Sequence, residues 1–292
     1  MDARYMRAAK STTQSGPVLV GVDGSASAHA AVELGAWEAR RRRVPLLLVH
    51  GYQDELPHAT VGLVTRTPVI SAVRDGARSM LEDIENRTHA THPGLTVRST
   101  LVGGGGASSL VELSRGASLV VVGCRGSGGF AGLLIGSVGA QVAMYSQAPM
   151  IVMRPPGRPD APVADAPVVV GVDGSSSGSD VVGFAFDEAK QRGVPLVAVH
   201  ATRDPGPVAD PADVLADALA GWAEKYPEVA LIRTVRPMDP APALIDASRE
   251  AGLVVVGNRG HGGFARLLLG SVSQALIGHA ACPVAVVRPV MP

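Results

Sequence analysis

Short runs of apolar residues alternate along the chain with longer stretches whose apolar positions recur at helical spacing. The run at 119–123 is apolar at every position before its terminal glycine, which indicates a strand with both faces buried in a parallel sheet. The same pattern predicts strands near 17–23, 45–50, 96–101, 119–123 and 149–154, and again near 167–173, 195–200, 229–235, 253–257 and 283–288. Helices are predicted near 26–43, 69–90, 107–116 and 137–147, and near 178–192, 211–225, 241–250 and 271–280.

This alternation predicts an α/β fold, with an open parallel sheet of five strands in each half of the chain. Each sheet is expected to have the Rossmann-like strand order 3-2-1-4-5 and helices on both faces. In that order the first and fourth strands are neighbours. Ligands of such sheets bind at the carboxyl ends of the strands, where the strand order reverses. The residues that follow the first and fourth strands are therefore the first candidates for a binding site.

The two halves of the chain repeat one another. Residues 18–25 read Val-Leu-Val-Gly-Val-Asp-Gly-Ser, and residues 168–175 read Val-Val-Val-Gly-Val-Asp-Gly-Ser. Similarity of this kind over nearly the whole chain indicates a tandem repeat of one domain. The predicted organisation is a disordered tail over 1–16, a first domain over 17–154, a Pro- and Ala-rich linker over 155–166 and a second domain over 167–292.

Composition and charge narrow the function classes. Of the 292 residues, 46% are hydrophobic and 3% aromatic, so we expect a core of Val, Leu and Ala. Because 26 basic residues balance 26 acidic ones, nothing favours binding to nucleic acid or to an anionic membrane. No apolar run is long enough to span a bilayer, and the polar N-terminus does not resemble a signal peptide. Cys124 and Cys282 stand at non-equivalent positions, which excludes a repeated disulfide framework and favours a reducing, cytoplasmic location.

Glycines follow the fourth strand of each repeat in the pattern G-x-x-G, nine further residues, then G-S at the start of a helix. Such a loop exposes backbone N–H groups, and a helix N-terminus adds unpaired donors, so the pattern predicts an anion site. It is neither a P-loop, since no Lys follows the last Gly, nor the dinucleotide pattern G-x-G-x-x-G. A turn that only reverses the chain is the alternative, and two occurrences weigh against it. The glycines and the serines expected as N-caps are Gly123, Gly126, Gly136 and Ser137, and Gly257, Gly260, Gly270 and Ser271.

With Asp23 and Asp173 at the ends of the first strands, this motif resembles the ATP-binding branch of the universal stress protein family, across both repeats. The resemblance implies a Rossmann-like fold of the adenine nucleotide alpha hydrolase type, with one ATP site per repeat and Mg²⁺ assisting at the phosphates. It implies that the aspartates lie beside the adenosine, and that the backbone of Gly51 and of Ala201 meets the adenine edge. Ribose and phosphates would be held by Gly123, Gly126, Gly136, Ser137 and Val138, and in the second repeat by Gly257, Gly260, Gly270, Ser271 and Val272.

Four residues within the glycine loops have two interpretations each. Arg125 and Arg259 either pair with phosphate or are exposed loop residues, and we include both in the predicted site. His261 has the same two interpretations, and the exposed one is favoured. Cys124 is either a redox-sensitive position or a small residue that fits, and the second interpretation is favoured.

Other polar features are interpreted as structural. His50 and His200, at the ends of the second strands, are expected to be satisfied structural residues. The arginines at 40–43 surround the C-terminal end of a helix, so they predict a solvated helix end rather than a nucleic-acid patch. The glycines at 103–106 could offer N–H groups to a ligand, but a flexible turn is favoured. The second repeat has prolines in that loop, at 237–242, and so departs from the family pattern.

Three function classes compete: a nucleotide-binding regulator, an ATP-using enzyme, and an interaction module whose site has lapsed. Intact motifs in both repeats argue against the lapsed site. The sequence has no Walker Lys, no H-R-D-type loop and no repeated carboxylate cluster near the glycines, which argues against efficient phosphoryl transfer. We therefore expect an ATP-binding regulator of stress response or growth with little or no hydrolysis, and slow ATPase or self-phosphorylating activity as the alternative. The apolar fifth strands, at 149–154 and 283–288, are expected to pair within the chain, and a homodimer of whole chains is a further option.

Overall fold

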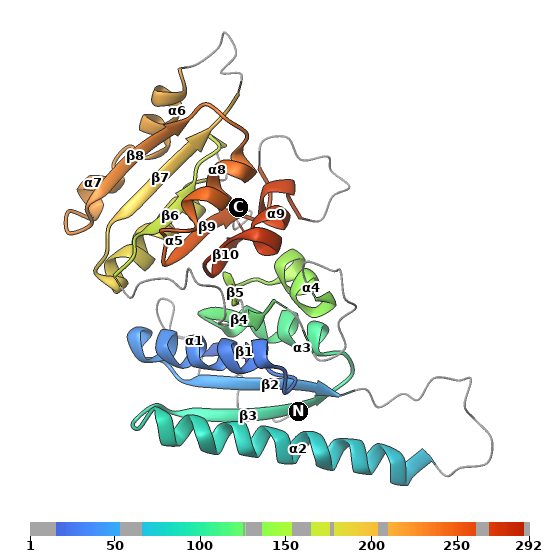
Figure 1. The fold of residues 1–292 in the computed structure, drawn as a ribbon. Helices are drawn as coiled ribbons and strands as arrows, with labels where there is room; N and C mark the ends of the chain where they lie inside the picture. Colours follow the sequence, from blue (N-terminus) through green and yellow to red (C-terminus); the bar gives the residue numbers. More distant parts are fainter. Residues whose placement is uncertain are drawn as a thin grey trace. The chain divides into compact units, whose positions relative to one another are not determined.

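The computed structural model of the protein describes residues 16–52, 66–124, 126, 136–153, 165–175, 178–203, 210–260 and 269–288, with 66–70 as backbone only (Figure 1). Residues 1–15 of the predicted tail and 155–164 of the predicted linker lie outside these ranges. The chain divides into two compact units, Met1–Ala148 and Pro149–Pro292, so the fifth strand of the first repeat is counted with the second unit.

The first unit alternates strands and helices as predicted, and its strands lie parallel in the order β3-β2-β1-β4. Because the chain moves one way across the sheet through α1 and α2, and the other way through α3 and α4, right-handed crossovers place these two pairs on opposite faces. The elements are β1 Val18–Gly21, α1 Ala26–Arg42, β2 Leu46–Tyr52, α2 Arg66–Thr91, β3 Val97–Gly103, α3 Gly106–Leu113 with a 3₁₀ turn Ser114–Gly116, β4 Leu119–Gly123 and α4 Ser137–Tyr145.

The second unit shows the predicted order in full, since its parallel strands run β8-β7-β6-β9-β10. The strand β5, Met150–Met153, runs antiparallel to β10 with Ile151 opposite Ala285, so the two fifth strands pair as expected. The other elements are β6 Val168–Gly171, α5 Gly178–Arg192, β7 Leu196–Ala201, α6 Pro211–Ala218, α7 Trp222–Lys225, β8 Leu231–Arg236, α8 Pro240–Ala247, β9 Leu253–Gly257, α9 Ser271–His279 and β10 Val284–Val287.

The central strands of both units are buried on both faces, as continuous apolar runs predict. Val18 lies between Leu46 and Leu119 in the ladder, and all three side chains are fully buried. In the second unit, Val168 lies between Leu196 and Leu253 in the same way. The structure thus confirms the predicted fold class, with a core built on aliphatic strands.

Two predicted helices end differently from expectation. The helix expected over 211–225 is two helices, α6 and α7, because Gly221 takes a φ of +74° between them and interrupts the helical path. The helix expected over 107–116 ends at Leu113 and continues as a 3₁₀ turn. Neither difference reaches the carboxyl ends of the first and fourth strands.

Candidate functional site

Asp23 stands where β1 ends and the chain turns into α1. The ladder with β2 continues one residue past the strand, since the Val22 N–H donates to the Val49 carbonyl at 2.9 Å. The Asp23 carboxylate then accepts the N–H of Ser25 through Oδ1 at 3.0 Å, and Gly24 takes a φ of +77° that favours glycine. This turn holds the carboxylate at the carboxyl end of the sheet.

The second unit builds the same turn with the same residue types. Asp173 follows β6, and its Oδ1 accepts the N–H of Ser175 at 2.9 Å. Gly174 takes a φ of +75°. The repeated Asp-Gly-Ser triplet therefore forms the same turn in both units. Glycine adopts the positive φ that the turn requires, and the serine N–H holds the carboxylate in place.

In both units this carboxylate lies against the second glycine of the motif that follows the fourth strand. A Cβ at Gly126 would lie 2.6 Å from Asp23 Oδ2, and a Cβ at Gly260 would lie 2.8 Å from Asp173 Oδ2. Real Cβ atoms essentially never make contacts this short, so the carboxylates as placed leave room only for glycine. The fold thus brings these four predicted site residues together in two pairs, one in each unit.

The first glycine of each motif allows the end of the fourth strand to pack closely. A Cβ at Gly123 would lie 2.8 Å from the carbonyl oxygen of Ser27, at the start of α1. A Cβ at Gly257 would lie 2.9 Å from the carbonyl oxygen of Arg259. These two glycines therefore serve packing, whatever they contribute to a ligand.

A backbone hydrogen bond closes each glycine loop at its base. The Gly136 N–H donates to the Cys124 carbonyl at 3.0 Å, and the Gly270 N–H donates to the Asn258 carbonyl at 2.8 Å. Each bond fixes the start of α4 or α9 beside the end of the preceding strand. The helix N-terminus and the strand end thus lie side by side in each unit, at the place where sheets of this topology form a ligand-binding crevice.

The N-caps of α4 and α9 are Gly136 and Gly270, not the serines that follow, so the predicted N-cap assignment is wrong by one residue. The first backbone bond of α4 runs from the Ala140 N–H to the Gly136 carbonyl at 3.0 Å. Because glycine has no side chain, neither cap satisfies the first helical N–H groups. The N–H groups of Ser137 and Val138, and of their counterparts Ser271 and Val272, therefore have no acceptor within their helices.

The backbone N–H and C=O of Gly51 lie on the edge of β2 that faces β1, beyond the point where β1 ends. Val49 faces β1, because its carbonyl accepts the Val22 N–H, whereas Tyr52 faces β3 and accepts the Gly104 N–H. Backbone groups alternate in direction along a strand, so the N–H and C=O of Gly51 point toward β1, which ended at Gly21. Among the described residues, no hydrogen bond occupies either group.

Ala201 has the same position in the second unit. Val199 faces β6, because its carbonyl accepts the Val172 N–H, and Thr202 faces β8, because its N–H donates to the Arg236 carbonyl. The N–H and C=O of Ala201 therefore point past the end of β6, into the crevice beside Asp173. Each unit thus offers one donor and one acceptor on a single residue at the edge of its crevice.

The glycine run before α3 has a packing role as well as forming a turn. A Cβ at Gly51 would lie 2.4 Å from the Cα of Gly106 and 2.5 Å from its nitrogen. Gly104 takes a φ of +89° on the way into the helix. The run therefore lets the start of α3 lie directly on β2, which neither of the two earlier interpretations described.

His50 and His200 each make a hydrogen bond to the carbonyl of the residue before the site aspartate. The Nδ1 of His50 lies 2.6 Å from the Val22 oxygen, and the Nδ1 of His200 lies 2.8 Å from the Val172 oxygen. A carbonyl only accepts, so Nδ1 carries the proton in both rings. The interpretation of these residues as satisfied histidines is confirmed.

Of the four loop residues with two interpretations each, the structure describes two. Arg259 is exposed, and Cys124 is buried and forms no disulfide. Arg125 and His261 lie outside the described residues. The predicted roles of all four toward a ligand stay predictions.

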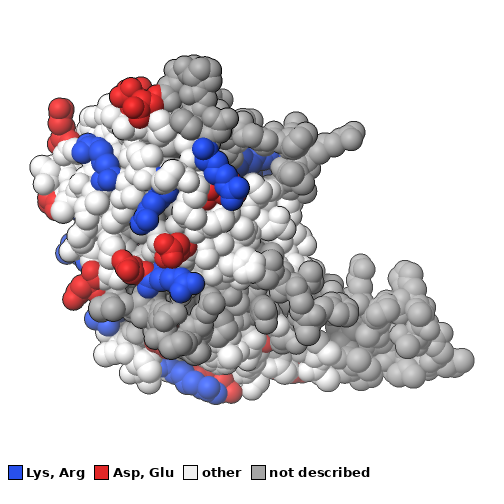
Figure 2. Space-filling model, turned by 45° about the horizontal axis from the view of Figure 1, so that its top comes forward, with Lys and Arg blue, Asp and Glu red and all other residues white. Residues whose placement is uncertain are grey.

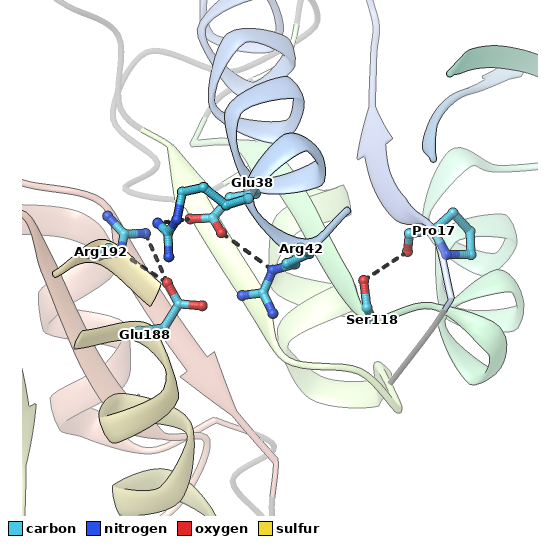
Figure 3. A network of polar contacts seen from close by, with 7 residues as sticks. Pro17, Glu38, Arg42, Ser118, Glu188 and Arg192 are labelled. Carbon is cyan, nitrogen blue, oxygen red and sulfur yellow. Dashed lines mark hydrogen bonds and ion pairs between the residues drawn. The ribbon is translucent and has the colours of Figure 1, made fainter. Parts of the chain in front are cut away.

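The arginines at the end of α1 are not simply solvated. Glu38 is fully buried and pairs with Arg41 at 3.9 Å and with Arg42 at 3.4 Å, and these two side chains are only 14% and 8% exposed (Figure 3). In the second unit the fully buried Glu188 pairs with Arg192 at 3.0 Å. The prediction of a solvated helix end is therefore wrong for Arg41 and Arg42, because a buried carboxylate on the same helix holds them.

On the face in Figure 2, basic and acidic side chains are interspersed, without a broad field of one sign. Among the described residues, no group of three His, Cys, Asp or Glu side chains is arranged to hold a metal ion. No helix in the described part of the chain combines the length and the apolar character needed to cross a bilayer.

The fold and the two crevices define the class of protein: a tandem of Rossmann-like α/β domains, each with an aspartate and a glycine motif at the ends of its first and fourth strands. The sequence profile described as "Universal stress protein family" matches residues 15–154 and 166–288. The chain therefore belongs to the universal stress protein family, with one family domain in each repeat.

Tandem relatives in mycobacteria match over nearly their whole length. The chain is 39% identical over 287 residues to the universal stress protein Rv2623 of Mycobacterium tuberculosis, covering 93% of this chain and 96% of the relative. It is 37% identical over 297 residues to a universal stress protein of Mycolicibacterium smegmatis, covering 96% and 99%. A solved universal stress protein from Archaeoglobus fulgidus DSM 4304 shares the fold, with a TM-score of 0.73 at 20% identity, over 95% of this chain and 100% of that one.

Proposed function

We propose that the protein binds two molecules of ATP, one in each unit, and that nucleotide occupancy is the signal by which it regulates stress response or growth. The observation that carries the proposal is the repeated crevice. In each unit an aspartate carboxylate, the described glycines of the motif, an uncapped helix N-terminus and an open backbone amide lie at the carboxyl ends of the first, second and fourth strands. Family membership adds that both repeats belong to one class of domain.

The phosphate end of the proposed site is the start of α4 or α9. There the N–H groups of Ser137 and Val138, or of Ser271 and Val272, lack acceptors within the helix, and the helix dipole favours an anion. Gly126 and Gly260 would let the phosphates approach the backbone closely. Mg²⁺ would be held mainly by phosphate oxygens and water, because no three metal-binding side chains converge among the described residues.

The base end of the proposed site is the amide of Gly51 or Ala201. One N–H and one C=O on the same residue complement adenine, whose base-pairing edge offers an acceptor and a donor side by side. Guanine reverses that pattern, so the same amide would favour ATP over GTP. Asp23 and Asp173 stand between the two ends, where their carboxylates can accept hydrogen bonds from ribose hydroxyls.

Occupancy rather than turnover is proposed as the output. Efficient phosphoryl transfer needs a base or a water-positioning residue and firm metal ligands around the γ-phosphate. The carboxylates that follow the first strands, Asp23 and Asp173, are each already engaged by the turn that comes after them. Slow hydrolysis or self-phosphorylation is compatible with this arrangement, whereas rapid turnover is not.

The proposed location is the cytoplasm. Cys124 and Cys282 are both buried and neither forms a disulfide, and burial raises the pKa of the Cys282 thiol to about 12, which leaves it protonated and inert. Cysteines without disulfides are ordinary in a reducing compartment.

The test is calorimetric titration of the nucleotide-free chain with ATP, joined to mass spectrometry of small molecules released from protein as purified. We expect two ATP per chain, and stabilisation by about 2.7 kcal/mol per site at a hundred times the dissociation constant. The variant pair Asp23→Glu with Asp173→Glu should lose binding while keeping the fold, since the longer side chain has no room against Gly126 or Gly260. Fewer than one ATP per chain, or tighter binding of FMN or NAD, would overturn the proposal.

A further inference from the structure

The imidazoles of His50 and His200 replace a backbone hydrogen bond at the mouth of each crevice. In a regular parallel ladder, the Val22 carbonyl would accept the N–H of Gly51, the next residue of β2 that faces β1. That bond is absent among the described residues. The Val22 carbonyl instead accepts the Nδ1–H of His50 at 2.6 Å. The ladder therefore stops one bond early, and the side chain takes the acceptor that the backbone would have used.

The consequence falls on the Gly51 amide. With its ladder partner engaged elsewhere, the N–H of Gly51 stays open toward the crevice. The carbonyl held by His50 also belongs to the residue directly before Asp23. One side chain thus keeps the amide of β2 available and fixes the backbone from which the site carboxylate departs.

In the second unit a histidine also replaces the backbone donor, although the neighbouring residues differ. His200 Nδ1 donates to the Val172 carbonyl at 2.8 Å, and the amide of Ala201 stays open. Ala201 stands where the first unit has Gly51, and α8 begins with Pro240 where α3 begins with Gly106. The histidine bond is common to both units although the residues beside it differ, so local packing alone does not account for it.

We propose that His50 and His200 are positioning residues for base selectivity: each holds the strand-end carbonyl so that the following amide is free to read the base-pairing edge of the nucleotide. This inference rests on the proposed nucleotide site and deepens it. Without the imidazole, the Val22 or Val172 carbonyl accepts the N–H of Gly51 or Ala201, and the ladder gains one backbone bond. That N–H is then no longer available as a donor to adenine. Phosphate contacts at the start of α4 and α9 are untouched, so GTP and ATP then bind with similar affinity.

The experiment compares dissociation constants for ATP and GTP in the full chain and in two variant pairs. His50→Leu with His200→Leu removes the donor at similar size, and the ATP-over-GTP preference should fall about tenfold, the worth of one hydrogen bond. His50→Asn with His200→Asn puts an amide nitrogen at the place of Nδ1, and should keep the preference within about twofold. A merely structural role would lower stability without changing the ratio of the two constants.

The matched control is His29→Leu. His29 Nδ1 also lies 2.9 Å from a backbone carbonyl, that of Ser25, but on the exposed side of α1. Its loss should leave the ATP-over-GTP preference unchanged. If the leucine pair does not fold, His50→Gln with His200→Gln serves instead, because its amide nitrogen stands one carbon further along the side chain and cannot reproduce the bond.

The outcomes separate the two proposals. If the unaltered chain binds no ATP, the proposed function fails. If it prefers ATP and the leucine or glutamine pair keeps that preference, the assignment of the histidines is overturned while the nucleotide site stands. Equal loss of ATP and GTP affinity would also overturn it, since that result marks damage to the whole crevice.

Discussion

Gly126 lies so close to the carboxylate of Asp23 that no methyl group fits between them. A Cβ at Gly126 would lie 2.6 Å from Asp23 Oδ2, and the same relationship holds between Gly260 and Asp173 at 2.8 Å. The obstructing atom is the end of a side chain rather than backbone. A substitution there should therefore move the carboxylate and leave the sheet and helices as they are.

The pair Gly126→Ala with Gly260→Ala is predicted to abolish nucleotide binding at both sites. The new methyl groups displace the two carboxylates and fill space that the phosphates approach. Because side-chain ends can yield, the free energy of unfolding should fall by only about 1 kcal/mol, the low end of the cost of overpacking. Calorimetric titration with ATP and urea unfolding measure the two effects separately. Wild-type affinity in this variant would show that the glycine loops are not the phosphate sites.

Gly76→Ala is the matched control for that pair. Gly76 lies in α2, and a Cβ there would meet nothing within 4 Å. Alanine in an exposed helix interior should raise the free energy of unfolding by about 0.5–1 kcal/mol. ATP affinity should not change, so loss of binding in this variant would mean that binding is sensitive to any glycine substitution.

The sequence predicted the strands and their order well because they depend on local apolar runs and on the chirality of crossovers. Val18, for example, is apolar, β-branched and buried between Leu46 and Leu119, as a central strand residue must be. The turn at Asp23 could also be predicted from the sequence, since the Asp-Gly-Ser triplet occurs twice. Such features need only a few consecutive residues to be specified.

Features that depend on distances between elements were not predictable in the same way. The contact of Gly51 with Gly106 requires knowing how closely α3 approaches β2, and the sequence shows only a glycine run. The shift of the N-cap from Ser137 to Gly136 follows from the bond of Gly136 to a carbonyl twelve positions earlier. The burial of Glu38, which pairs with Arg41 and Arg42, likewise comes from tertiary packing rather than from the charge pattern.

Arg43 provides a stability prediction that does not involve the ligand. It takes a φ of +56° at the C-cap of α1, a left-handed conformation that is costly for residues with a Cβ. Gly193 takes a φ of +67° at the equivalent end of α5. Arg43→Gly should therefore raise the free energy of unfolding by about 1 kcal/mol, measured by urea denaturation.

The reciprocal substitution tests the same cause in the second unit. Gly193→Ala introduces no contact, since nothing lies within 4 Å of a Cβ there, and any destabilisation must come from the positive φ. We expect a loss of about 1 kcal/mol. Opposite signs for Arg43→Gly and Gly193→Ala support the backbone explanation, and equal signs contradict it.

Tyr226 gives a prediction for alkaline pH. Its hydroxyl donates to Asp187 at 2.7 Å, and burial, followed by this bond and the nearby carboxylates, raises the pKa of the phenol to about 12. The unfolded phenol has a pKa of about 10. The native state therefore holds the proton more tightly, and this stabilisation is complete below pH 10 and is lost as the pH rises toward 12.

Tyr226→Phe should accordingly destabilise the chain by about 1 kcal/mol at pH 8, and by less at pH 11. Urea unfolding of both proteins at the two pH values measures the difference, and other groups that titrate in both cancel. Tyr145 is 45% exposed, so the control variant Tyr145→Phe should leave the free energy of unfolding at pH 8 nearly unchanged. A constant difference between Tyr226→Phe and the unaltered chain would mean that the phenol does not titrate differently in the folded state.

The pairing of β5 with β10 predicts where a disulfide can be introduced. Ile151 lies opposite Ala285, and Val152 lies opposite Val284. Opposed residues of an antiparallel pair alternate between hydrogen-bonded and non-hydrogen-bonded positions, with Cα atoms about 5.5 and 4.5 Å apart. Both separations lie within the range that a disulfide spans, and one of these two adjacent pairs has the closer side chains. At least one of the two double-cysteine variants should therefore oxidise to a bridge.

The experiment uses the full chain with Cys124→Ala and Cys282→Ala, so that the introduced thiols are the only ones. Bridge formation is followed by the mass change on oxidation and by faster migration of the denatured, unreduced chain, since the bridge closes a loop of more than a hundred residues. Such a loop should also stabilise the chain by about 4 kcal/mol against unfolding. The control is Ile151→Cys with Val287→Cys, which shifts the register by two residues and should not bridge. Bridging in the shifted pair, or in neither of the opposed pairs, would show that these strands do not hold the register that the structure assigns.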